Sequence, residues 1–172
     1  MLQNNNQDME KARVFFEKAY KVAASENFDY AIELYLEGIR YAPDEVQIGH
    51  IPLRELALLR QQKGGKPPGM IEKVRRARAK TPIEQMINAE FLLSKDPFHM
   101  PFAEAMLKAA VDGRCKNTAK WIADLIFLAN NNAAKPSFRT YQLLKESYSK
   151  IGLFDRAIAA LHRAVKLRPQ DG

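Results

Sequence analysis

The sequence predicts an all-α protein in which antiparallel helix hairpins stack into a right-handed superhelix. Apolar residues recur at spacings of three and four through most of the chain, which is the period of an amphipathic helix. Glycine or proline stands where the predicted helices end. The alternating pattern of a half-buried strand is absent. With 172 residues, 47% of them hydrophobic, the chain has the size and composition for one array of small helical units.

The N-terminal segment contains two such stripes in succession. The first extends from Met9 to Ser25, and the pattern breaks at Asn27. The second stripe follows at once, and Pro43 lies just past its end, where a proline prevents a helix from continuing. Two helices joined by so short a turn form an antiparallel hairpin.

The last forty or so residues repeat this arrangement, with a turn around Gly152 and a closing Pro169. When Pro43 is superposed on Pro169, large and small residues fall on similar residues along both helices. The aligned pairs include Phe15 with Tyr141, Phe28 with Phe154, Ala31 with Ala157, Tyr35 with Leu161 and Gly38 with Ala164. Such self-similarity indicates an internal structural repeat.

This pattern resembles the tetratricopeptide repeat, a helix hairpin of about 34 residues. A bulky residue occurs early in the first helix, small residues occur where the helices cross, and proline follows the second helix. The chain would then be a single domain of about four repeats, at 9–43, 45–97, 100–132 and 136–169, with a basic insertion at 63–81. The resemblance implies a concave groove, lined by the first helix of each hairpin, in which a segment of a partner protein lies.

The resemblance also indicates which residues would line that groove. Aromatic and arginine side chains among them would suit a partner that has both apolar and acidic groups. The alternative for each residue is that it only packs between repeats. The groove residues carried over by repeat position are Arg13, Phe16, Tyr20, His50, Arg54, Arg139 and Gln142.

The basic insertion is the second candidate site. Residues 63–80 contain seven Lys and Arg and one acidic residue, so almost the whole net charge of +7 belongs to this stretch. We expect an arm that projects from the second hairpin, with Lys73, Arg75, Arg76 and Arg78 as its binding residues. The arm could be solvated without a partner, could bind an acidic protein, or could contact nucleic acid or an anionic membrane. Nucleic-acid binding is the less favoured of these, because the segment has no aromatic residue on which bases could stack.

The sequence does not predict catalysis, a metal site or a cofactor. The stretch GGKPPG lacks the Ser or Thr and the preceding strand of a phosphate-binding loop, and Pro67 has no backbone N–H to offer. His50, His99 and His162 have no partner at metal-ligand spacing, and Cys115 is the only cysteine. We therefore expect a non-catalytic interaction module, a scaffold or small adaptor, that binds another protein or peptide.

Location and assembly are expected from simpler features. The polar start of the chain lacks the apolar core of a signal peptide, and no apolar run is long enough to span a bilayer, so we expect a cytoplasmic protein without a membrane span. The last hairpin has no further helix to cover it. Its outer side, with Tyr141, Leu143 and Leu167, is therefore a candidate surface for homo-oligomer formation.

Overall fold

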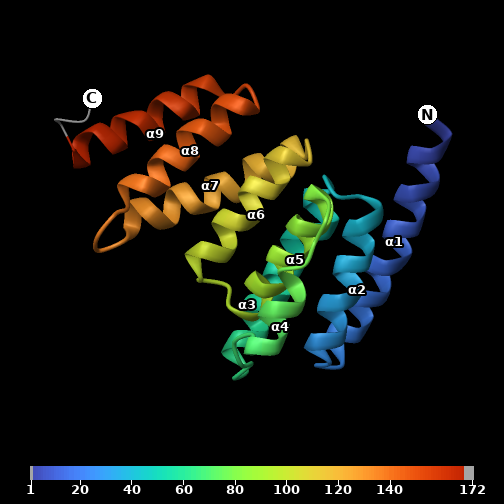
Figure 1. Cartoon of the computed structure of the whole chain (residues 1–172). Helices are drawn as coiled ribbons and strands as arrows, with labels where there is room; N and C mark the ends of the chain where they lie inside the picture. The colour runs from blue at the N-terminus through green and yellow to red at the C-terminus, as the bar shows by residue number, and fades with distance from the viewer. Residues whose placement is uncertain (1, 169–172) are drawn as a thin grey trace.

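A computed structural model describes residues 2–168, and this range contains nine α-helices and one π-helical turn but no strand (Figure 1). The helices follow one another across the molecule from α1 to α9, and the two ends of the chain lie at opposite ends of the array (Figure 1). The elements are α1 (Leu2–Ala24), α2 (Phe28–Tyr41), η1 (Val46–His50), α3 (Ile51–Gln62), α4 (Met70–Arg76), α5 (Pro82–Lys95), α6 (Met100–Asp112), α7 (Lys116–Asn132), α8 (Phe138–Lys150) and α9 (Phe154–Leu167). The predicted all-α array of stacked hairpins is confirmed.

Four hairpins make up the array. Helix α1 packs on α2, α3 on α5, α6 on α7, and α8 on α9. Neighbouring hairpins are joined by contacts of α2 with α3 and α5, of α5 with α6, and of α7 with α8. Each hairpin thereby covers an apolar face that the previous one exposes, which is how a helical solenoid builds its core.

Local sequence signals determine where several helices begin. The Thr81 hydroxyl accepts from the Glu84 N–H, the Glu84 carboxylate accepts from the Thr81 N–H, and Pro82 occupies the first turn of α5. This is a capping box, which satisfies backbone donors that a helix start leaves free. Ser137 caps α8 in the same way by accepting from the Thr140 N–H.

The first and last hairpins have equivalent helix bounds and the same turn conformation. The superposition of Pro43 on Pro169 places the ends of α2 on the ends of α9, and each helix has 14 residues. In the turn before these helices, Glu26 and Gly152 occupy the same repeat position and both have positive φ, 57° and 78°. The repeat detected in side chains therefore extends to the backbone conformation of the turn.

The close crossing of α1 and α2 requires a glycine at position 38. A Cβ at Gly38 would overlap the Phe16 ring and would lie 3.1 Å from the Ala12 carbonyl oxygen. Phe16 is 5% exposed and stacks on Tyr35. The glycine thus lets the two helices approach closely around one aromatic ring.

The outer face of the last hairpin differs from the prediction in one residue. Tyr141 is buried, with its hydroxyl donating to the Asn131 side chain, whereas Leu143 is half-buried and Leu167 is exposed. The exposed apolar stripe lies instead on α9, at Phe154, Ile158, Leu161 and Val165. The prediction that Tyr141 faces outward is wrong, because α7 packs on that side of α8 and covers it.

Candidate functional site: an apolar groove between α1 and α3

A cavity of about 770 Å³ lies between α1 and α3, with Tyr35 of α2 also in its wall. Helix α1 contributes one wall, and η1 and α3 contribute the other. The lining residues are Arg13, Phe16, Glu17, Tyr20, Lys21, Ala23, Tyr35, Gln47, Ile48, Pro52, Glu55, Leu56 and Leu59. We call this cavity the α1–α3 groove.

The start of α3 shapes one wall of this groove. Pro52 lies in the first turn of α3 and has no N–H to donate, so a regular helical ladder cannot extend backward through it. The preceding residues form the wider η1 turn, in which the Ile51 N–H donates to the Val46 carbonyl. The Glu45 carboxylate caps this turn by accepting from the Gln47 and Ile48 N–H groups. This cap fixes the backbone that presents Ile48 to the groove.

The groove is apolar within and charged at its rim. Tyr20 is 73% exposed, and Leu59 and Ile48 are 42% and 39% exposed, so large apolar side chains are open to a ligand. Burial, with the nearby charge of Glu55, raises the pKa of Tyr35, so its hydroxyl stays protonated at neutral pH and can donate a hydrogen bond. Such a surface can hold an apolar side chain and orient its polar neighbours.

The structure brings three of the predicted groove residues together: Arg13, Phe16 and Tyr20. Arg139 and Gln142 do not join them, because they lie exposed on α8, toward the other end of the array (Figure 1). Several lining residues were not predicted, among them Ile48, Pro52 and Leu59. The apolar period of α3 marks these residues as helical but does not show which of them stay uncovered.

His50 is not a groove residue, which corrects the prediction. Its ring is fully buried: Nδ1 lies 2.7 Å from Glu90 Oε1, and Nε2 lies 3.0 Å from the Pro43 carbonyl oxygen. With the Glu90 carboxylate and the Pro43 carbonyl as acceptors, both ring nitrogens donate, an arrangement that favours the protonated imidazolium. Thr118 also donates to the Pro43 carbonyl, and the ring of Trp121 lies 5.8 Å from that of His50. His50 therefore joins the first three hairpins.

Arg54 is also drawn away from the α1–α3 groove. It is half-buried and donates to the Pro97 carbonyl at 3.3 Å. Burial lowers the pKa of its guanidinium. With Trp121 it borders a small separate pocket between α3, α5 and α7. The prediction that Arg54 faces the same cavity as Tyr20 is therefore wrong, because Arg54 lies on the side of α3 that meets α5 and α7.

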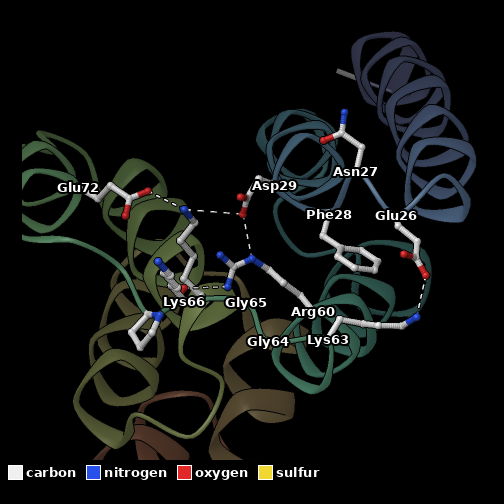
Figure 2. Close-up of a pocket in the computed structure, with 12 residues that line it drawn as sticks. Glu26, Asn27, Phe28, Asp29, Arg60, Lys63, Gly64, Gly65, Lys66 and Glu72 are labelled. Atoms are coloured by element: carbon white, nitrogen blue, oxygen red, sulfur yellow. Dashed lines mark hydrogen bonds and ion pairs between the residues drawn. The ribbon is translucent and has the colours of Figure 1, made fainter.

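A second, polar pocket of about 610 Å³ lies where the α1–α2 turn meets the end of α3 and the insertion (Figure 2). Arg60 donates to Asp29 at 2.8 Å and to the Lys66 carbonyl at 2.9 Å. Lys95 bridges Glu72 at 2.7 Å and Asp29 at 3.7 Å. These contacts attach the insertion to α2, α3 and α5. The residues of this pocket therefore hold the insertion against the rest of the protein.

The insertion is not a projecting arm, which corrects a second prediction. Its helix α4 packs against α5. Arg76 donates to Glu33 at 2.8 Å and to Asn88 at 3.2 Å, and its guanidinium lies 3.9 Å from the centre of the Phe91 ring. Lys73 lies near the ring of Phe102. Arg75 and Arg78 remain exposed. Sequence reasoning missed the acidic anchors because they lie on other helices.

Residues 2–168 contain no group of three or more His, Cys, Asp or Glu side chains arranged to hold a metal ion. Cys115 is buried, and burial raises the pKa of its thiol to about 11, so the reactive thiolate is scarce at neutral pH. Within the same part of the chain, no helix combines the length and hydropathy needed to cross a membrane.

Comparison with known protein families finds a match in the last hairpin. Residues 138–171 match the model of the tetratricopeptide repeat. The C-terminal hairpin is similar to a tetratricopeptide repeat. This match to one repeat, together with the all-helical hairpin array, supports a tetratricopeptide-type family for the chain. No curated protein and no solved structure matches the chain. A tetratricopeptide repeat suggests a protein–protein interaction module, and such repeats are generally non-catalytic.

Proposed function

We propose that this chain is a cytoplasmic, non-catalytic adaptor that binds a segment of a partner protein in the α1–α3 groove. The observation that supports this most directly is an apolar groove with a large exposed aromatic side chain, Tyr20, at its mouth. Exposed aromatic side chains beside a pocket are characteristic of residues that contribute most to protein binding.

The partner segment would have both apolar and acidic groups. Apolar side chains would pack against Tyr20, Ile48 and Leu59, and a carboxylate would pair with Arg13 or Lys21 at the rim. Glu17 and Glu55 also line the groove. They would repel a segment whose charge is wholly acidic, so the segment must place its carboxylates against Arg13 or Lys21.

The test is an affinity isolation of protein partners, followed by measurement of their affinity with purified components. In the double variant Tyr20→Ala/Leu59→Ala we expect affinity to fall at least about tenfold, since two apolar contacts are lost. Both side chains are exposed, so the fold should be retained.

The matched control is Tyr30→Ala/Leu128→Ala, which removes an exposed tyrosine and an exposed leucine outside the groove, from α2 and α7. It should leave affinity unchanged. Equal affinity of both double variants would exclude the α1–α3 groove as the binding site. Binding through apolar contacts should also weaken little as salt rises, in contrast to binding by many Lys and Arg.

A further inference from the structure

Helix α4 turns charged side chains toward the protein and apolar side chains toward solvent. Two of its charged residues face the protein: Arg76 contacts Glu33, Asn88 and Phe91, and Glu72 binds Lys95 at 2.7 Å and the Gly69 N–H at 2.8 Å. Amphipathic helices at a protein surface normally bury their apolar side. Here ion pairs and a cation–π contact hold the helix in place.

The apolar side of α4 therefore faces solvent. Met70 and Ile71 are each 76% exposed, and Val74 is 51% exposed. Among the residues that the structure describes, no large hydrophobic side chain is more exposed than Met70 and Ile71. With Arg75 and Arg78, the three residues border a hollow of about 330 Å³. We call these five residues the α4 patch.

The exposed charges in the segment that carries the α4 patch are positive. Arg75 and Arg78 belong to the patch, and Lys73 and Lys80 are exposed close to it in sequence. The only acidic residue between Lys63 and Lys80 is Glu72, and its carboxylate is bound to Lys95 and Gly69. The patch thus combines apolar side chains with positive charge, and the one acidic residue of α4, Glu72, is already bound to Lys95 and the Gly69 N–H.

We propose that the α4 patch binds a short segment of a partner protein that carries both aliphatic or aromatic residues and carboxylates. One or two apolar side chains of the segment pack among Met70, Ile71 and Val74, while its carboxylates pair with Arg75 and Arg78. Arginine can bind a carboxylate with two parallel hydrogen bonds, which gives such a pair direction as well as strength. This surface is distinct from the α1–α3 groove, and the proposal does not depend on that groove being functional.

The composition of the α4 patch favours this occupant over two others. Nucleic acid would use the arginines, but three exposed aliphatic side chains add nothing to phosphate binding, and the patch has no aromatic residue for base stacking. A membrane surface would use both features. However, three side chains on a helix of seven residues bury too little apolar area for stable insertion.

The test selects ligands with a random twelve-residue peptide library displayed on phage. The bait is the full chain with Tyr20→Ala/Leu59→Ala, so that binding in the α1–α3 groove is removed. The expected result is enrichment of peptides that contain both Asp or Glu and Leu, Ile or Phe. Fluorescence anisotropy with the enriched peptides then measures their affinity for variants of the same chain.

Two double variants address the two halves of the patch. Ile71→Ser/Val74→Ser and Arg75→Gln/Arg78→Gln should each weaken binding at least tenfold. The matched controls lie on α9: Ile158→Ser/Leu161→Ser removes two exposed apolar residues, and Arg163→Gln/Lys166→Gln removes equal charge. Both controls should bind as the parent does, and circular dichroism should show the same helix content throughout.

Several results would overturn the proposal. Enriched peptides without carboxylates, or equal loss of binding in the patch variants and the α9 variants, would show that the α4 patch has no selectivity of this kind. Tighter binding of a twelve-nucleotide single-stranded DNA, or of vesicles with phosphatidylserine, than of any selected peptide would assign the patch to nucleic acid or to membrane instead. The groove experiment is unaffected by each of these outcomes.

Discussion

The pKa of His50 lies above the usual histidine value although the ring is buried. Burial alone lowers the pKa of His50, but the charge and hydrogen bond of Glu90, the Pro43 carbonyl and the charge of Asp44 together raise it above the usual 6.5. One ring therefore holds a buried ion pair and a backbone contact between hairpins. Such pairs are costly to break, because the remaining charge stays buried without its partner.

The variant His50→Leu should lower the free energy of unfolding by about 3 to 5 kcal/mol, as removal of one member of a buried pair does. Urea unfolding measures this. The double variant His50→Leu/Glu90→Leu should recover part of the loss, because it removes the unpaired charge. If the double variant is as unstable as the single one, packing rather than charge is the cause.

The same group predicts a pH dependence. Histidine in the unfolded chain titrates near 6.5, and the folded pKa is higher, so the folded state binds the proton more tightly. This contribution to stability is complete below about pH 6.5 and is lost as pH rises through the folded pKa. Between pH 6 and 8 the wild-type protein should lose stability that His50→Leu does not lose. His162→Gln, an exposed control on α9, should follow the wild type.

At the scale of helices, Gly38 decides how closely α1 and α2 approach. The equivalent residue in the last hairpin is the buried Ala164, and Gln142 occupies the sequence position that corresponds to Phe16. The two hairpins thus keep the same helix bounds although the residues at this pair of positions differ.

The variant Gly38→Ala should destabilise the protein by about 1 to 3 kcal/mol, because the new Cβ overlaps the Phe16 ring. Helix propensity alone predicts the opposite sign, a gain of about 1 kcal/mol. The sign of the change in urea unfolding therefore separates the two effects. Ala164→Gly is the control, and it should cost about 1 kcal/mol from propensity alone. A stabilised Gly38→Ala would show that α1 and α2 can separate without loss.

At the scale of the whole molecule, the two ends of the array are unequal. Residues Ile32, Tyr35 and Ile39 of α2 are buried beneath the next hairpin, whereas their equivalents Ile158, Leu161 and Val165 on α9 are 50%, 44% and 37% exposed. Helix α2 lies between α1 and the second hairpin, whereas α9 packs mainly on α8, and in a linear array each unit gains stability from the neighbours it packs against.

Amide hydrogen exchange should therefore be faster in α9 than in α2, although the two helices have equal length. Exchange followed by mass spectrometry measures this, and light scattering of the same sample reports the mass. Equal protection of α9 and α2 together with the mass of a dimer would support self-association through the α9 stripe. Equal protection in a monomer would contradict the expected effect of the open end.

The sequence by itself determined the helices and their order, because each helix depends on local features. Apolar residues at spacings of three and four, the Thr81 capping box and the prolines after α2 and α5 act within a few residues along the chain. The internal repeat was readable for the same reason, since equal spacing in sequence produces equal hairpins. These local features do not depend on which other helix packs against each one.

Only the tertiary structure decided which side chains remain available for binding. Arg13, Phe16 and Tyr20 share a cavity, yet His50 binds Glu90 and Arg54 binds the Pro97 carbonyl, both on the side of α5. Arg76 became an anchor because Glu33 and Phe91 lie beside it on helices distant in sequence. Burial and ion pairing depend on contacts between hairpins, and the spacing of residues along one helix does not specify what packs against it.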